Sequence, residues 1–261
     1  MNLTNIKGAV FFDLDGTLLN DRSRIDDEVA QAITQLKENQ ILPVICTGRS
    51  PQEIQHAQEM TSIETVITLN GSLVKNSDEI VYQRVIPTAL LDQVIGFANS
   101  SNTAVSMYND KQIYSTTDST NEIIESHKLI AEPIPEVNPD FYKDHDISML
   151  VVYTKESADV YTEQFGTDMT FYKTGAYSID CVMKNETKKT GIQHLLKELQ
   201  LTDIPTYAFG DGPNDVEMLG YVDHPVVMGN AGEDIFQYAE FITTKNTDHG
   251  IVNGLKHFDL I

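Results

Sequence analysis

An apolar run near the start of the chain ends in two aspartates one residue apart. Residues Gly8–Phe12 are apolar, and Asp13-Leu14-Asp15-Gly16 follows them directly. A run bounded by a glycine turn is typical of a buried strand, in which side chains i and i+2 share a face. We therefore expect both carboxylates to project together from the carboxyl end, where ligands bind in open α/β sheets. Because two adjacent carboxylates repel unless a cation or a shared proton intervenes, the pair indicates a divalent metal site. An Asp-Gly turn exposed to solvent remains the alternative when this motif is taken alone.

Apolar runs alternate with helix-patterned segments in the first and last thirds of the chain. This alternation predicts a parallel sheet with right-handed crossovers, and thus an α/β fold. The expected helices are 26–39, 51–60 and 190–199, and the expected strands are Gly8–Phe12, Ile41–Cys46, 64–69, 206–209 and 226–228.

The middle of the chain has a different pattern. Short β-like stretches there lie between and after two helical segments, and 132–139 is rich in proline. This mixture predicts an α+β module with an antiparallel sheet, inserted at 82–184 into one α/β domain formed by 1–81 and 185–261. The expected helices are 87–99 and 120–128, and the expected strands are Ala104–Tyr108, 112–115, 147–153, 170–174 and Ser178–Met183.

Composition excludes several classes of function. With 39 acidic residues against 18 basic ones, the net charge is −21, and a nucleic-acid partner is not expected. The sequence contains no apolar stretch of the roughly 20 residues that a membrane span needs. It begins without the basic segment and apolar core of a secretory signal, and its two cysteines form no C-x-x-C motif. We expect a cytoplasmic protein.

Three further motifs accompany the aspartate pair. Thr47-Gly48-Arg49 follows the second predicted strand, where a hydroxyl and free N–H groups would suit a phosphate oxygen. Either Lys188 or Lys189 places a cation at the start of a helix. The segment Gly210-Asp211-Gly212-Pro213-Asn214-Asp215 sets two more acids at a strand end, a pattern that favours metal ligation.

Together these motifs resemble those of the haloacid dehalogenase-like phosphatase superfamily, specifically its Cof-type branch with a type IIB cap. The resemblance covers the whole chain and places the lysine of the third motif at Lys188. Softer marks of the same branch are Asn70-Gly71 and Met228-Gly229-Asn230-Ala231. The resemblance implies a Rossmann-like core with a central parallel sheet, and it makes the insertion at 82–184 a cap domain that sets substrate choice.

The same resemblance implies a Mg²⁺-dependent phosphatase that hydrolyses small organic phosphate monoesters, such as sugar phosphates or phosphorylated cofactors, through an aspartyl-phosphate. Asp13 would be the nucleophile and Asp15 the acid/base. The metal ligands would be a carboxylate oxygen of Asp13, the backbone carbonyl of Asp15 and the side chain of Asp211, with Asp215 nearby. Thr47, Gly48, Lys188 and Asn214 would hold or orient the phosphoryl group. A phosphotransferase or phosphomutase, or a non-catalytic sensor of phosphorylated metabolites, is the alternative. We expect a monomer or homodimer.

Overall fold

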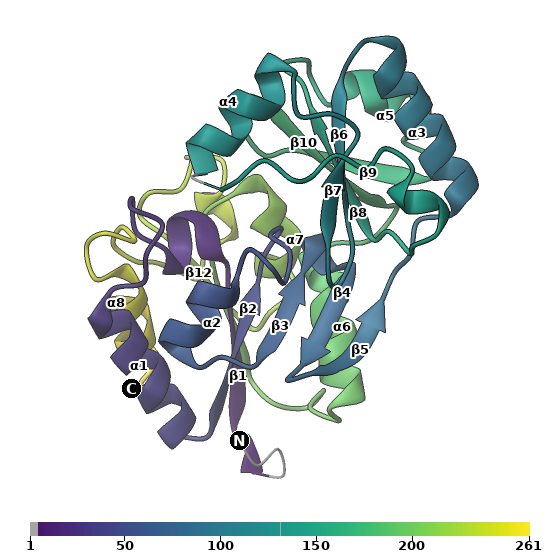
Figure 1. The fold of residues 1–261 in the computed structure, drawn as a ribbon. Helices are drawn as coiled ribbons and strands as arrows, with labels where there is room; N and C mark the ends of the chain where they lie inside the picture. Colours follow the sequence, from purple (N-terminus) through teal and green to yellow (C-terminus); the bar gives the residue numbers. More distant parts are fainter. Residues whose placement is uncertain (1–4, 131) are drawn as a thin grey trace. The chain divides into compact units, whose positions relative to one another are not determined.

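The chain divides into two compact units. The computed structural model describes residues 5–130 and 132–261 (Figure 1). Unit 1 comprises Met1–Arg49, Glu53–Tyr82 and Thr187–Ile261, and unit 2 comprises Ser50–Gln52 and Gln83–Glu186. Unit 1 is therefore assembled from segments on both sides of unit 2 in the sequence.

The sheet of unit 1 is mostly parallel and has eight strands in the order β13-β12-β11-β1-β2-β3-β4-β5. Parallel pairs join β13 through to β3, and β4 runs antiparallel to β3. The strands are β1 (Gly8–Phe12), β2 (Ile41–Cys46), β3 (Thr65–Thr68), β4 (Leu73–Asn76), β5 (Glu79–Gln83), β11 (Thr206–Gly210), β12 (His224–Val227) and β13 (Phe241–Ile242). The expected α/β class is confirmed.

Strand β1 is the point at which the order of strands reverses. Its parallel neighbours are β2 on one side and β11 on the other, so that the chain fills the sheet outwards from β1 in both directions. In sheets of this kind, crossover connections leave from opposite faces at such a point, and ligands bind at the carboxyl ends of the strands there. Asp13 directly follows β1, and so lies at this point.

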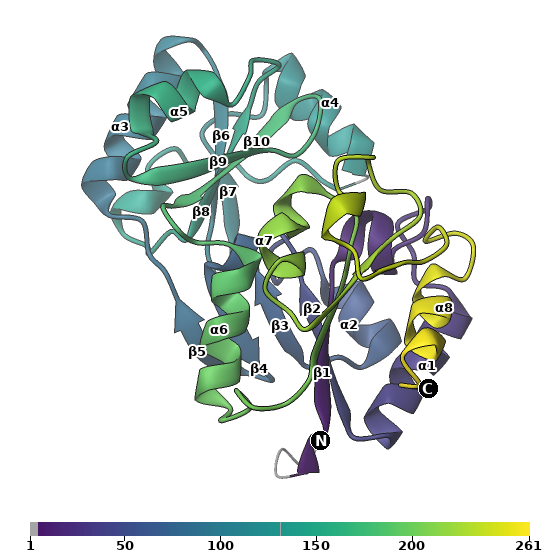
Figure 2. The ribbon, with the colours of Figure 1, turned by 180° about the vertical axis from the view of Figure 1, so that it is seen from behind.

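Helices cover both faces of this sheet, as Figures 1 and 2 show from opposite sides. One core joins Val10 and Phe12 of β1 to helices α1 (Asp27–Glu38), α2 (Gln55–Thr61) and α8 (Gly250–His257). The other joins Ala9 and Phe11 to α6 (Lys188–Glu198) and α7 (Val216–Leu219). The alternation of β1 side chains between two apolar cores explains why its sequence is a continuous apolar run.

Unit 2 is built on an antiparallel sheet with the order β7-β6-β8-β10-β9. Helices α3 (Thr88–Ser100) and α5 (Asp159–Phe165) pack their apolar residues on one face, and α4 (Asn121–Ile130) contacts β8 and β10. The strands are β6 (Ala104–Tyr108), β7 (Ile113–Ser115), β8 (Met149–Tyr153), β9 (Met169–Lys173) and β10 (Ser178–Met183). The antiparallel sheet expected for the insertion is confirmed.

Several elements differ from the expected ones. Helix α2 begins at Gln55, because residues 51–54 form a turn instead of a helix. The hairpin of β4 and β5 was not expected, and neither were the short helices α5 and α8. Among the described residues, no helix is both long and apolar enough to cross a membrane.

Gly71 allows helix α6 to approach the loop after β3. Its φ is +96°, and a Cβ built on it would lie 2.0 Å from the backbone oxygen of Thr187, the residue before α6. An added Cβ is fixed to the backbone of residue 71, and its neighbour is a backbone oxygen. Neither can move away as the end of a flexible side chain could. Gly71 therefore fixes the position at which α6 starts, and with it the position of Lys188.

Gly71→Ala is expected to lower the free energy of unfolding by about 2 kcal/mol or more, because it adds both backbone strain and a steric clash. Thermal denaturation would measure the change. Gly96→Ala is the matched control, since Gly96 lies within α3 and a Cβ there meets nothing within 4 Å. An unchanged or raised melting temperature is expected for the control. Equal effects of the two variants would show that the contact of Gly71 with Thr187 is unimportant.

Candidate active site

The turn after β1 carries the second aspartate of the first motif. The strand ends at Phe12, and residues Leu14–Leu18 form a single irregular turn in which Gly16 has a φ of +78°. A Cβ on Gly16 would lie 2.3 Å from Asp211 Oδ2, so this position also needs glycine for a close contact. Asp13 is buried, whereas the Asp15 side chain is 58% exposed. The strand itself ends at Phe12, so both aspartates belong to the turn and differ in burial.

Lys188 lies buried between two carboxylates. Its Nζ is 2.5 Å from Asp13 Oδ1 and 2.6 Å from Asp215 Oδ1. Thr187 caps the helix that begins at Lys188, because its hydroxyl accepts a hydrogen bond from the backbone N–H of Thr190. The next residue, Lys189, instead places its Nζ over the ring of Tyr221, 5.6 Å from the centroid. Of the two lysines left open by the sequence, Lys188 is the one that joins the acidic groups.

The loop after β11 supplies the other two acids. Asp215 Oδ2 accepts hydrogen bonds from the backbone N–H groups of Asp211 (3.0 Å) and Gly212 (2.9 Å). Since its other oxygen contacts Lys188, Asp215 has both oxygens engaged by protein groups. Asp211 accepts a hydrogen bond from the Thr17 hydroxyl at 2.9 Å and is only partly buried. Asp211 is thus the more accessible carboxylate of the two.

Carboxylate oxygens of Asp13, Asp211 and Asp215 all lie within 4.8 Å of one another. Three carboxylates around the single ammonium of Lys188 leave an excess of two negative charges when all are ionised. Hard oxygen ligands with this excess fit a divalent cation such as Mg²⁺. The charge and the oxygen ligands of this cluster therefore suit the divalent metal that the sequence predicts.

The electrostatics of the cluster follow from burial and crowding. Burial raises the pKa of Asp13 well above its usual value, and nearby Asp215 and Asp211 add to the effect while Lys188 opposes it. Burial alone would lower the pKa of Lys188, but Asp13 and Asp215 outweigh it and hold the lysine protonated. For Asp211, burial raises the pKa to about 6 although the hydrogen bond from Thr17 lowers it. A cation among these acids would relieve their repulsion.

The Thr47-Gly48-Arg49 loop follows β2, the strand beside β1. Thr47 is buried, its hydroxyl accepts a hydrogen bond from the backbone N–H of Arg49, and its carbonyl accepts one from Asn70. The Asn214 side chain in turn donates to Asn70 Oδ1 at 3.2 Å. Through Asn70, these bonds connect the Thr47-Gly48-Arg49 loop to Asn214 in the loop after β11.

Three residues for which the sequence gave no role stand out at this site. Arg49 pairs with Asp15 through two hydrogen bonds, and Asn70 links Thr47 to Asn214. Asn230 donates to the Gly16 carbonyl at 2.8 Å and to Asp211 Oδ2 at 3.3 Å. The sequence does mark these positions, since Asn70-Gly71 and Gly229-Asn230-Ala231 are motifs of the branch and Arg49 completes another. Their partners lie too far away in the sequence to be inferred from it.

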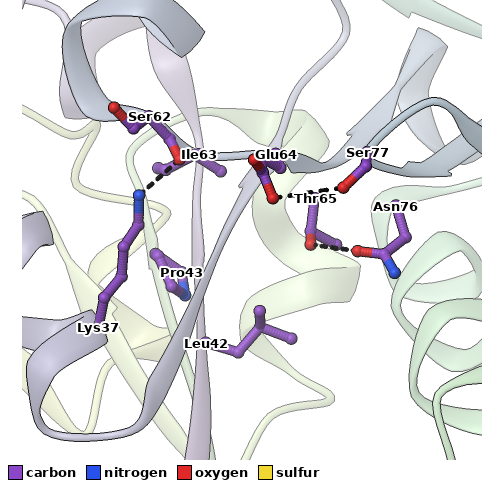
Figure 3. A pocket seen from close by; sticks show the side chains of 9 residues that line it. All are labelled: Lys37, Leu42, Pro43, Ser62, Ile63, Glu64, Thr65, Asn76 and Ser77. Carbon is purple, nitrogen blue, oxygen red and sulfur yellow. Dashed lines mark hydrogen bonds between the residues drawn. The ribbon is translucent and has the colours of Figure 1, made fainter. Parts of the chain in front are cut away.

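A separate cavity of about 340 Å³ lies at the amino ends of β2 and β3, away from the ends that carry the acidic cluster. Figure 3 shows that its polar side chains bond to neighbouring groups: Lys37 to a backbone carbonyl, Glu64 to Ser77, and Thr65 to Asn76. We assign no function to this cavity.

Comparison with known proteins gives a consistent result over nearly the whole chain. A family model described as haloacid dehalogenase-like hydrolase matches residues 10–255. The phosphatase YwpJ of Bacillus subtilis is 24% identical over 292 residues, covering 95% of this chain and 98% of its own. The 5-amino-6-(5-phospho-D-ribitylamino)uracil phosphatase YwtE of the same species is 23% identical over 278 residues, covering 93% and 95%.

Solved structures agree with the sequence relatives. The structure of the subclass IIB sugar phosphatase BT4131 has a TM-score of 0.86 and 25% identity, covering 97% of this chain and 100% of its own. A protein from Geobacillus kaustophilus has a TM-score of 0.88 and 27% identity, covering 97% and 99%. The comparisons of structure and of sequence thus agree, and both extend over nearly the whole chain.

Proposed function

This chain belongs to the haloacid dehalogenase-like hydrolase family, and we propose that it is a Mg²⁺-dependent phosphatase that hydrolyses small phosphate monoesters through an aspartyl-phosphate on Asp13. The observation that carries the proposal is the buried cluster in which Lys188 lies between Asp13 and Asp215, with Asp211 within reach. Three carboxylates and one ammonium from segments far apart in the sequence lie close together there, and we propose that they serve as nucleophile, metal ligands and balancing cation.

Asp13 is the proposed nucleophile. One of its carboxylate oxygens attacks phosphorus, the bond from phosphorus to the ester oxygen breaks, and the departing oxygen takes a proton from Asp15. Water then attacks the phosphorus of the aspartyl-phosphate and gives a proton back to Asp15. The bond from phosphorus to the Asp13 oxygen breaks, so that inorganic phosphate is released and both carboxyl groups are regenerated. The reversal of roles for Asp15 between the two steps is what microscopic reversibility requires.

The other site residues hold charge in place. Lys188 stabilises negative charge on the transferring group, and the Thr47 hydroxyl and Gly48 N–H are proposed to bind phosphoryl oxygens. Asn214 orients this region through Asn70. Asp13, Asp211 and the backbone carbonyl of Asp15 would hold Mg²⁺, with Asp215 fixing their surroundings. When bound, the ion neutralises charge and positions the phosphoryl group.

We propose that unit 2, most of which is the segment 83–186, acts as the cap domain that selects the leaving group. Its own sheet and apolar core make it an independent element that can differ among family members without disturbing the acidic cluster. YwtE and BT4131 act on phosphorylated ribityl and sugar compounds by their names. Sugar phosphates and phosphorylated cofactors are accordingly the first substrates to test.

Phosphate release from a panel of such esters, with Mg²⁺ and with EDTA, tests the proposal. EDTA is expected to reduce the rate by on the order of 10³-fold or more, because the metal offsets several kcal/mol of charge repulsion in the transition state. Added Mg²⁺ should restore the rate, and circular dichroism should confirm that the chelated protein stays folded. Release that persists in EDTA would contradict the metal requirement. Loss of the ester without phosphate release, with the phosphoryl group recovered on an added hydroxyl compound, would identify a phosphotransferase instead.

A further inference from the structure

Arg49 and Asp15 form a bidentate ion pair close to the acidic cluster. Arg49 Nε donates to Asp15 Oδ2 at 2.8 Å, and its Nη2 donates to Oδ1 at 2.6 Å. The guanidinium side chain is only 15% exposed, whereas the carboxylate side chain is 58% exposed. Two charge-assisted bonds in this geometry give both strength and a fixed orientation. The carboxylate is therefore held by a largely buried partner.

This pair occupies both oxygens of Asp15. Its carboxylate is not a member of the group formed by Asp13, Asp211 and Asp215. An acid/base must reach the oxygen that leaves the phosphorus attacked by Asp13, and a carboxylate with both oxygens bonded to a guanidinium has to give up at least one bond to do so. In this arrangement both oxygens of Asp15 are engaged by Arg49.

The same guanidinium is well placed to meet a phosphoryl group. Arg49 belongs to the loop that carries Thr47 and Gly48, and its backbone is fixed there, because its N–H donates to the Thr47 hydroxyl and its carbonyl accepts from Leu69. A guanidinium fork matches phosphate oxygens as well as it matches a carboxylate. Since the backbone is held, rotation of the side chain alone exchanges one partner for the other.

We propose that Arg49 is a positioning residue that holds Asp15 in the substrate-free protein and transfers its hydrogen bonds to phosphoryl oxygens when substrate binds, which frees Asp15 for proton transfer. The proposal rests on the proposed phosphatase function. Its consequence is that the carboxylate of Asp15 competes with phosphate for Arg49.

A double-mutant cycle tests this competition. The dissociation constant of inorganic phosphate is measured by calorimetry, in Mg²⁺ and at a single pH, for the wild type, Asp15→Asn, Arg49→Met and the double variant. Asp15→Asn is expected to tighten phosphate binding by about 10-fold, because it weakens the competitor for Arg49. In the Arg49→Met background the same substitution should change the affinity by about 2-fold or less, since no guanidinium remains to be released. Arg49→Lys should recover only part of the affinity, because an ammonium cannot form the fork.

Removal of a negative charge would by itself favour an anion. Asp21→Asn is the matched control for this effect. Asp21 is exposed and follows the turn that contains Asp15, and its substitution removes the same negative charge. A change of less than about 2-fold is expected for it, because screening weakens exposed charges. If Asp15→Asn tightens phosphate binding equally with and without Arg49, simple electrostatics explains the gain and the competition is refuted.

The proposed function fails in a different way. If the wild type releases phosphate from esters but the cycle shows no coupling between Asp15 and Arg49, only the proposed role of Arg49 is refuted. If the wild type neither releases phosphate nor binds it, and no variant does, the phosphatase proposal falls and the role of Arg49 falls with it.

Discussion

Asp13→Asn is expected to abolish phosphate release, with a loss on the order of 10⁴-fold or more, because an amide cannot attack phosphorus and the covalent intermediate is lost. The fold should survive this change. Asp13 is a buried acid whose pKa is raised by burial and by its acidic neighbours, and its removal leaves Lys188 paired with Asp215. The variant should thus unfold at a temperature equal to or above that of the wild type in metal-free buffer.

A mass measurement separates the nucleophile from a purely structural role. Wild-type protein mixed with substrate and quenched in acid should carry a phosphoryl adduct on the peptide that contains Asp13, and the variant should carry none. Release that continues in Asp13→Asn would show that another group attacks phosphorus and would overturn the mechanism.

Lys188→Met is expected to have the largest effect on stability. The substitution leaves the carboxylates of Asp13 and Asp215 buried without their shared cation, and loss of one partner from a buried ion pair costs about 3–5 kcal/mol. Phosphate release should fall as well, because charge on the transferring group loses its stabilising lysine. Chemical denaturation in metal-free buffer would measure the change in the free energy of unfolding.

Mg²⁺ should stabilise Lys188→Met more than it stabilises the wild type, because the variant has one more uncompensated negative charge for the ion to offset. Lys189→Met is the matched control. Its ammonium lies over the ring of Tyr221, an interaction expected to contribute about 1 kcal/mol or less. Comparable destabilisation by the two substitutions would contradict the placement of charge in the cluster.

The strands of the core could be predicted because buried parallel strands have a simple signature. Both faces of β1 and β2 contact apolar cores, so each appears in the sequence as a continuous apolar run that ends at a polar turn. The hairpin of β4 and β5 was missed for the converse reason. Strand β5 lies at the edge of the sheet and is half exposed, so its polar residues hide the pattern.

The geometry of the site could be predicted only in part. The position of each motif at the end of a strand followed from the pattern, but the choice between Lys188 and Lys189 depends on how α6 contacts the loop of Gly71. Adjacent residues of a helix point about 100° apart, and only packing decides which one faces inwards. The bond from Arg49 to Asp15 cannot be predicted from strand alternation, because Asp15 lies in an irregular turn after the strand has ended.

The central position of β1 also determines the order in which the protein can assemble. Lys188 and Asp13 are 175 residues apart, and β11, the second neighbour of β1, emerges from the ribosome only after all of unit 2. Until then β1 is an open edge whose side chains are entirely apolar, which is the kind of strand that recruits other chains. Unit 2 contains its whole sheet and core in one nearly continuous stretch and has no such delay. We therefore expect that recovery of folded protein during synthesis depends on how long β1 remains without β11. This delay follows from the position of β1, which leads directly to Asp13 of the acidic cluster, in the middle of a sheet whose strands are interrupted in the sequence by unit 2.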